Sequence, residues 1–445
     1  MNMLETIKNA WKVVDLRKKI LFTLFIIIVF RVGSAIPVPF IDPAALAASD
    51  VTGGIFQSIS ILTGGALEYG AIFALGVTPY INSSIIMQLL SVAIPALERL
   101  SHEGEEGRKK IAKYTRFATV ILALIQGIAY YIFLERNGIV TVKGIGAKWF
   151  AGAVVTLALA AGSALVMWLG EQIDEKGIGN GISILLFAGI LSRAPQAFRG
   201  LVYLWGLEYQ VAVVGIVVVF LLVIAFIVWM TAAERRLPVQ YAKRVVGRKM
   251  LGGQNTHIPI KVNMSGVMPI IFANSIVAVP ATIRAFMGES THNWFTDFVD
   301  YWFNYNTVIY LIVFLILLVA FAYFYVAISF NPVEVANNIK NNGGAIPGIR
   351  SGRPTVEFIK KVLGRITLVG ALLVAVIACV PMLAGVISMP IANALPETLF
   401  ASAVSYIGFM AFGGSSLMIV VGVALETTRE LEAQMSLRNY KGFLD

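Results

Sequence analysis

The sequence predicts an all-α integral membrane protein with about ten transmembrane helices, from its composition and from the length and pattern of its apolar runs. Hydrophobic residues make up 58% of the 445 residues and charged residues only 13%, whereas roughly a quarter of a soluble domain is charged. A helix needs roughly 20 apolar residues to cross a hydrocarbon core of about 30 Å, and the runs have this length. They do not alternate between polar and apolar residues, as the strands of a membrane barrel would. The expected architecture is therefore a bundle of membrane helices.

Ten runs are long and apolar enough to be spans. In chain order they cover residues 20–38, 71–97, 116–134, 149–170, 182–204, 209–232, 264–287, 306–330, 363–384 and 397–424. The fifth is interrupted by Arg193, Pro195 and Arg199, and we expect it to end near Arg193. The first follows basic residues, as the apolar part of a signal peptide does. It is too long for that part, and no convincing small-residue cleavage site follows it, so we interpret it as a span.

The basic residues predict the orientation of the bundle. If the N-terminus is cytoplasmic, the cytoplasmic segments contain 28 of the 35 Lys and Arg residues, and the segments on the opposite side contain 5. Cytoplasmic loops of membrane proteins carry the excess of Lys and Arg. Both termini are therefore predicted to be cytoplasmic, and this bias accounts for most of the net charge of +10.

Ionisable residues are almost absent from the interiors of the predicted spans, the interrupted fifth run aside. Arg31 is the one charged residue there, with no Asp, Glu, Lys or His. Carriers driven by protons or sodium use intramembrane carboxylates or histidines, although backbone carbonyls can also bind sodium. A secondary transporter with inverted repeats is thus an alternative that the sequence disfavours. A non-catalytic insertase or scaffold is a second alternative.

No catalytic, metal or nucleotide site is predicted. His102, His257 and His292 lie in loops, so no Ser–His dyad can form at membrane depth. Cys379 is the single cysteine, which excludes an internal disulfide and a cysteine-based metal cluster. The glycine-rich stretch 177–181 has no preceding strand, and nothing in the chain matches the phosphate-binding loop motif. We therefore expect neither an enzyme nor a cofactor, and any energy must come from a partner.

Two spans are unusually polar. They contain Thr78, Pro79, Asn82, Ser83, Ser84 and Gln88 in the run 71–97, and Ser265, Pro269, Asn274 and Ser275 in the run 264–287. Single residues of this kind hold membrane helices together. Clustered in two spans, they indicate helices that face water, or face each other across a seam that can open. The branched residues Val77, Ile81 and Ile271 stand isolated among them, and apolar residues in a water-lined path can close it by dewetting.

Segments outside the spans are also unusual. The glycine-rich stretch 52–70 includes an apolar part, 55–62, that is too short to span. An extracellular loop, an interfacial helix and a segment folded back into the bundle are all compatible with it. Loops 233–263 and 331–362 are long for helix connections, and basic loops can bind RNA phosphates or an acidic protein surface. The cations that we expect to dock a partner there are Arg235, Arg236, Lys243, Arg244, Arg248, Arg350 and Arg353.

Long motifs resemble segments of the SecY family, in the same order and over nearly the whole chain. Two segments resemble the two signatures of this family: IFALGVTPYINSSIIMQLL at 72–90 and EQIDEKGIGNGISILL at 171–186. Further similar segments are HIPIKVNMSGVMPIIFA at 257–273, FNPVEVANNIKNNGGAIPGIRSGRPT at 330–355 and GGSSLMIVVGVALE at 413–426. Departures from the usual family residues occur at Val77, Asn82, Asp174 and Leu186. Each roughly keeps size or polarity and leaves the assignment intact.

The resemblance implies a fold of two pseudo-symmetric, inverted halves, spans 1–5 in residues 1–205 and spans 6–10 in residues 206–445. It implies a narrow apolar ring made by Val77, Ile81, Leu186, Ile271 and Ile419. A plug at about 55–70 would close the outer funnel, with the apolar residues Ile55, Phe56, Ile59, Ile61, Leu62 and Leu67. Spans 2 and 7 would form a lateral gate with spans 3 and 8, near Asn82, Gln126, Asn274 and Ser275.

The resemblance also implies a function and partners. The chain would be the central channel of a protein translocase in the bacterial plasma membrane. It would move unfolded secretory polypeptides across the membrane and release transmembrane segments through the lateral gate. Its partners would be the SecE and SecG subunits, the SecA motor, the ribosome through its RNA phosphates, signal sequences and membrane lipids.

The charge distribution generates a prediction about topology. Cysteines introduced at Gly247 and Ser351 should react with a membrane-impermeant thiol reagent only from the cytoplasmic side, and one at Asn293 only from outside. The unmodified chain, with Cys379 in an apolar run, is the background control. Labelling of position 247 from outside would overturn the orientation, because it would place the most basic loop on the wrong side.

Overall fold

The computed structural model describes residues 3–48, 63–142, 144–206, 210–241, 244–246, 249–251, 255–287, 293–303, 307–394 and 414–441. The first half of the chain forms α1 (Met3–Lys12), α2 (Val14–Gly33), α3 (Pro43–Ala48), α5 (Thr78–Ala93), α6 (Pro95–His102), α7 (Glu105–Arg136), α8 (Ile145–Lys176), α9 (Gly181–Leu191) and α10 (Ala194–Gly206). The second half forms α11 (Gln210–Ala232), β1 (Glu234–Tyr241), β2 (Arg244–Val246), β3 (Lys249–Leu251), β4 (Asn255–Lys261), α12 (Met268–Met287), α13 (Trp294–Trp302), α14 (Val308–Ser329), α15 (Pro332–Asn341), β5 (Gly344–Ala345), α16 (Arg353–Ala394) and α18 (Gly414–Lys441).

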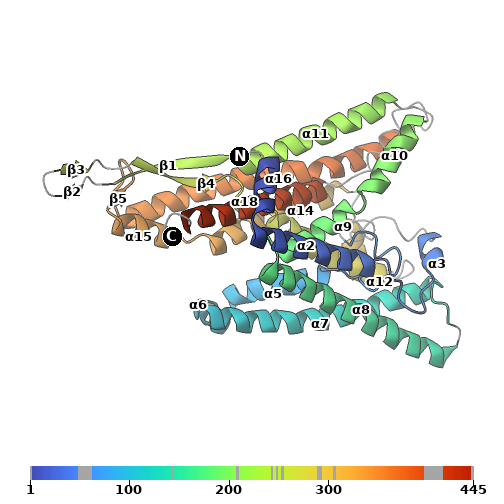
Figure 1. Cartoon of the computed structure of the whole chain (residues 1–445). Coiled ribbons are helices and arrows are strands. Elements are labelled where there is room, and N and C mark those ends of the chain that lie inside the picture. The colour runs from blue at the N-terminus through green and yellow to red at the C-terminus, as the bar shows by residue number, and fades with distance from the viewer. Residues whose placement is uncertain are drawn as a thin grey trace.

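The prediction of a helical membrane bundle is confirmed (Figure 1). A helix lies at the place of each of the ten predicted spans. Within the described residues, six helices are long and apolar enough to cross a membrane, or seven if the pair formed by α5 and α6, bent by 105°, counts as one span. For the tenth span the structure describes only the part from Gly414 on, as α18.

The second span is shorter than predicted. The apolar run predicts a start at residue 71. In the structure, residues 72–77 form turns and the helix begins at Thr78. Gly76 has a φ of +53°, a left-handed conformation that interrupts a helix and that glycine adopts without strain. Pro79 lies in the first turn, where its missing N–H is no loss and its fixed φ suits a helix start. An apolar run can therefore include a turn that its hydropathy does not reveal.

The fifth span breaks where the sequence predicted. The helix α9 ends at Leu191, two turn residues follow, and α10 begins at Ala194. The Asn180 side chain accepts a hydrogen bond from the backbone N–H of Ser183 at 3.0 Å and so caps the start of α9. Asp174 Oδ1 accepts from the N–H of Gly181 at 2.7 Å. The carboxylate at position 174, a departure from the usual family residue, thus satisfies a donor that the start of α9 leaves free.

The two long loops contain a small β-sheet, which the sequence analysis missed. Strand β1 pairs antiparallel with β4 and with β5, so β1 lies in the middle. Leu237 and Val239 are buried and alternate with the exposed Arg236, Pro238 and Gln240, the period-2 pattern of a half-buried strand. Because β5 belongs to the loop 331–362, the pairing of Gln240 with Ala345 joins both loops into one unit, which projects from one end of the bundle (Figure 1).

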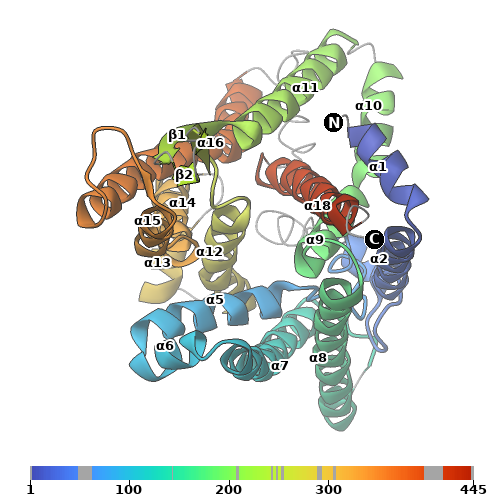
Figure 2. The same ribbon diagram turned by 60° about the vertical axis from the view of Figure 1, so that its left-hand side comes forward.

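The centre of the bundle is surrounded by four helices, α5, α9, α12 and α18 (Figure 2). The helices α7 and α8 pack on one side, where α7 also contacts α5; α14 and α16 pack on the other, where α14 contacts α12. The first and second halves of the chain meet where α12 packs against α5 and α7, and where α18 packs against α9. This arrangement brings the two polar spans, α5 and α12, next to each other.

Candidate functional site

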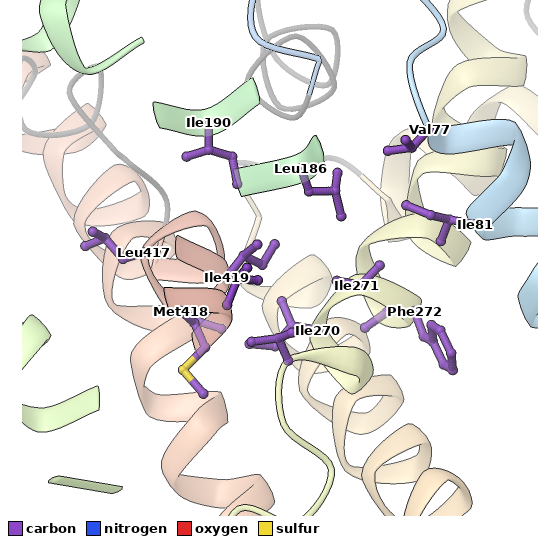
Figure 3. Close-up of a cluster of buried hydrophobic side chains, with 14 of the residues drawn as sticks. Val77, Ile81, Leu186, Ile190, Ile270, Ile271, Phe272, Leu417, Met418 and Ile419 are labelled. Atoms are coloured by element: carbon purple, nitrogen blue, oxygen red, sulfur yellow. The ribbon is translucent and has the colours of Figure 1, made fainter. Parts of the chain in front are cut away.

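The five apolar residues predicted to form a ring lie in one buried cluster (Figure 3). Val77 directly precedes α5 and Ile81 lies in its first turn, whereas Leu186 comes from α9, Ile271 from α12 and Ile419 from α18. The exposed fraction of these side chains is between 1% and 7%. The side chains of Ile81, Leu186, Ile271 and Ile419 are directed toward a common centre (Figure 3). Four elements far apart in the sequence therefore contribute branched aliphatic side chains to one buried cluster.

The cluster has further members that were not predicted from the sequence, among them Ile190. It is fully buried and lies on α9 beside Leu186. Residues i and i+4 share one face of a helix, and Ile190 follows Leu186 by four residues. Helical spacing counted from Leu186 could therefore have identified it. Ile270 and Met418, each with no exposed surface, lie on the same two helices as Ile271 and Ile419.

Close backbone contact fixes α9 against α8. A Cβ atom on Gly181 would collide with the carbonyl oxygen of Gly170, and one on Gly170 would collide with the side chain of Ile182. The absence of side chains at both positions lets the two helices approach closely. With the bonds of Asp174 and Asn180, this packing sets the direction of α9 and hence the position of Leu186.

Polar contacts hold the segment 63–77 that leads into α5. The Tyr130 hydroxyl donates to the carbonyl oxygen of Leu67 at 2.9 Å, and Arg31 Nη1 donates to the carbonyl oxygen of Gly64 at 3.3 Å. Arg193 Nη2 lies 2.7 Å from Glu68 Oε1. Leu67, one of the predicted plug residues, is 7% exposed. The other five, Ile55, Phe56, Ile59, Ile61 and Leu62, lie outside the described residues.

The predicted gate residues are brought to one boundary. Asn82 lies on α5, Gln126 on α7, and Asn274 and Ser275 on α12, which packs against both other helices. Asn82 is 7% exposed and Ser275 is 8% exposed, while Gln126 and Asn274 are half-buried. The Ser83 hydroxyl on α5 is fully buried, with no hydrogen-bond partner in the described part of the chain. Such an unpaired group costs about 1–3 kcal/mol.

Five of the seven predicted docking cations are described by the structure, and they lie on the sheet unit or beside it. Arg235 and Arg236 are exposed on β1, and Arg236 Nε lies 2.8 Å from Glu234 Oε1. Arg244 begins β2, whereas Lys243 and Arg248 lie outside the described residues. Arg350 is exposed in the turn between β5 and α16, and the side chain of Arg353 is 92% exposed.

The turn that carries Arg350 has a defined shape. Gly348 and Gly352 have φ values of +81° and +105°, conformations that glycine adopts without strain. The carbonyl oxygen of Arg350 accepts a hydrogen bond from Thr355 Oγ1 at 2.8 Å. The Arg350 side chain is thus presented by an ordered turn.

A cavity of about 360 Å³ lies where the sheet unit joins the bundle, lined among others by Lys261, Asn263, Tyr325, Glu426 and Arg429. Burial lowers the pKa of Lys261, the nearby cation of Arg429 lowers it further, and Glu426 and Glu234 oppose this shift. Arg429 Nη2 donates to the carbonyl oxygen of Thr231 at 3.0 Å. This bond ties α18, which carries Ile419, to the end of α11, immediately before β1.

In the described part of the chain, no group of three or more His, Cys, Asp or Glu side chains is placed to bind a metal ion. The geometry defines a class of protein. It is a multi-span helical membrane protein whose central helices converge on a buried apolar cluster, with a basic unit projecting at one end.

Comparisons with known proteins agree with this class and identify the family. The SecY family profile matches residues 71–428. The protein translocase subunit SecY of Streptomyces coelicolor is 42% identical over 460 residues, covering 99% of this chain and 100% of that protein. That of Mycobacterium tuberculosis strain H37Rv is 39% identical over 457 residues, with the same coverage. This chain belongs to the SecY family.

Solved structures agree in fold. A protein-conducting channel superposes with a TM-score of 0.63 at 18% identity, covering 94% of this chain and 92% of that one. Sec61 in a canine ribosome–channel complex superposes with a TM-score of 0.61 at 16% identity, with the same coverage. With the family shown, the prediction from the sequence is confirmed: the chain is the protein-conducting channel subunit of the Sec translocase and not an enzyme.

The polar contacts of segment 63–77 generate a prediction. Glu68→Gln removes the charge that faces Arg193, and a charge-assisted hydrogen bond contributes roughly 1.5–3 kcal/mol. The amides of residues 63–76 should then exchange with deuterium at least several-fold faster in the reconstituted channel, as measured by mass spectrometry.

The matched control is Glu105→Gln. Glu105 pairs with Lys109 on α7, but its side chain is 82% exposed, and exposed pairs contribute little. If Glu68→Gln exchanged no faster than this control, the ion pair with Arg193 would not be what holds the segment.

Proposed function

We propose that the apolar cluster is the constriction of the channel and acts as a yielding gasket. The observation that carries this is the convergence of Val77, Ile81, Leu186, Ile271 and Ile419 from four central elements. A translocating polypeptide has no common charge or shape, so a fixed polar site would not fit successive segments. Branched aliphatic side chains adapt to any chain and leave an ion without a partner, which makes its entry costly. The closed pore would exclude water and ions by dewetting.

The remaining parts of the channel follow from the same arrangement. Residues 1–205 and 206–445 would be two inverted halves, with the lateral gate between α5 and α7 on one side and α12 and α14 on the other. Asn82, Gln126, Asn274 and Ser275 would line the gate, and the stretch 55–70 would be the plug. A signal sequence would part the helices. An apolar segment would then pass to lipid, driven by roughly 25 cal/mol per Å² of apolar surface removed from water.

The proposed location and partners rest on homology and on the charge bias, and not on individual contacts. The chain is a multi-pass membrane protein and a homologue of bacterial SecY. The charge bias favours the bacterial plasma membrane with both termini in the cytoplasm. Its relatives are named as translocase subunits and its structural neighbours include ribosome–channel complexes. SecE, SecG, the SecA motor and the ribosome are therefore the proposed partners, with the motor or the ribosome docking on the sheet unit.

The gasket predicts the effect of one polar substitution. Burying an Ile side chain contributes roughly 1.5–3 kcal/mol, so Ile419→Asn should destabilise the closed state by about this amount. Since roughly 1.4 kcal/mol is tenfold in an equilibrium, the closed-to-open equilibrium should shift about tenfold or more. The variant should conduct ions when idle, measured in planar bilayers, and should export substrates with defective signal sequences.

The control carries the same substitution on a lipid-facing surface. Ile316 on α14 is 60% exposed, so Ile316→Asn puts an amide into a span without touching the cluster. If Ile419→Asn showed the same idle conductance and the same signal stringency as this control, the proposal that the cluster is the constriction would be wrong. Crosslinking from position 81 to a stalled secretory chain would test the path independently.

Docking on the sheet unit predicts a special sensitivity at Arg350. Its planar guanidinium can bond bidentately to carboxylate or phosphate, which Lys cannot copy. Arg350→Glu should abolish SecA-dependent transport into vesicles and Arg350→Lys should impair it, with expression, insertion and idle conductance preserved. Lys360→Glu reverses another exposed positive charge in the same loop. It is the control for the effect of charge reversal alone. If Arg350→Glu supported full transport, the docking role of Arg350 would be wrong, and the positive charges of this loop would serve only to set the orientation of the protein in the membrane.

A further inference from the structure

The short helix α13, which connects two spans, has an aromatic face that the described residues leave exposed. Trp294, Phe298, Tyr301 and Trp302 follow one another at helical spacing and are 81%, 42%, 60% and 41% exposed. Their rings form a continuous row, with centroids 5.9 Å apart for Trp294 and Phe298 and 6.2 Å apart for Phe298 and Trp302. Exposed aromatic surface of this kind marks an interaction site.

The other two faces of α13 differ in kind. Thr296 and Val299 are 0% and 2% exposed and face the bundle, where α13 packs against α12 and α14 (Figure 2). Asp297 and Asp300 are exposed on the third face. At 100° per residue, the aromatic side chains are centred about 145° from the bundle-facing ones and about 115° from the acidic ones, so the three groups occupy separate faces. A helix at a membrane surface has this order, with one side on protein, one in the interfacial layer and one in water.

The place of α13 in the fold agrees with this. The helix lies between the end of α12 at Met287 and the start of α14 at Val308, on the side opposite the basic sheet unit. Its nine residues are too few to span a bilayer. Trp and Tyr collect at the level of the lipid headgroups, where an apolar ring and a polar edge are both accommodated.

Polar bonds connect α13 to the end of α12. Arg284 Nε donates to both carboxylate oxygens of Asp300, at 2.9 and 3.0 Å, and the Arg284 side chain is only 15% exposed. Arg136, at the end of α7, donates from Nη1 to the carbonyl oxygen of Met287 at 2.8 Å. The outer ends of α7, α12 and α13 are therefore joined.

We propose that α13 is a lipid-binding interfacial helix. Its aromatic face lies in the headgroup region of the outer leaflet, and the ion pair of Arg284 with Asp300 anchors the outer end of α12 to it. The recognised surface is the boundary between headgroups and acyl chains of any phospholipid. The attraction of α13 to the membrane comes from burial of its aromatic rings. Because the exposed acids beside them, Asp297 and Asp300, do not attract anionic headgroups, we expect no preference for anionic lipids.

Two adjacent positions test the lipid contact in the complete channel. An environment-sensitive nitrobenzoxadiazole probe is attached to a single cysteine at position 298 or at position 297, in a Cys379→Ser background. The channel is reconstituted in phosphatidylcholine vesicles with or without lipid carrying a shallow nitroxide. The probe at 298 should be quenched by the nitroxide lipid and protected from aqueous iodide, and the probe at 297 should behave in the opposite way. Both patterns should persist at high salt.

Two outcomes would overturn the lipid contact. Equal iodide quenching at 297 and 298 would place the aromatic face in water. Protection of 298 from both quenchers would mean that another protein surface covers it.

A second measurement tests the anchor. Asp300→Asn removes the charge facing Arg284 and leaves every aromatic side chain in place. Deuterium exchange at the end of α12, up to Met287, should be several-fold faster than in the parent. Glu105→Gln, at an acid that is 82% exposed at the opposite end of α7, should leave it unchanged. Equal exchange in the two variants would remove the anchoring role. Neither measurement depends on where the channel opens.

Discussion

The structure depends on a central apolar cluster whose side chains make no hydrogen bonds to one another. Ile81, Leu186, Ile271 and Ile419 meet at the centre of the bundle through dispersion and exclusion of water alone. Such contacts can be exchanged for contacts with another apolar surface without leaving an unpaired group. A hydrogen-bonded centre would lose its partners whenever it opened, at about 1–3 kcal/mol for each buried group. The near absence of ionisable groups from the spans is the same constraint seen in the sequence.

Directional bonds are placed around this centre, where they fix the elements that carry it. Asp174 and Asn180 fix the start of α9, and the glycines at 170 and 181 set its distance from α8. Tyr130 fixes the segment before α5 through the carbonyl of Leu67. The positions of the apolar side chains are therefore determined by polar groups that do not belong to the cluster. The buried hydroxyl of Ser83 on α5 is an exception, because it has no hydrogen-bond partner among the described residues.

The sequence predicted the helices because a bilayer imposes a length on apolar runs, and each predicted span overlaps a helix in the described part of the chain. It misplaced the start of the second span because hydropathy does not register the left-handed turn at Gly76. The sheet escaped prediction since β5 has two residues and is defined only by its pairing with β1, a contact between loops roughly a hundred residues apart in sequence. Family motifs identified five residues of the cluster, whereas Ile190 required the geometry of α9. What depends on local composition was predictable, and what depends on distant pairing was not.

The distant pairing matters because it places the sheet unit close to the helices of the apolar cluster. Strand β4 ends at Lys261, and the same chain enters α12 and reaches Ile271 ten residues later. Arg429, ten residues beyond Ile419 on α18, bonds to Thr231 directly before β1 begins. Both ends of the hairpin formed by β1 and β4 are thus connected to a helix that contributes to the apolar cluster. Since β5 pairs with β1, the turn that carries Arg350 belongs to the same unit. The sheet unit and the apolar cluster therefore share α12 and α18 as structural supports.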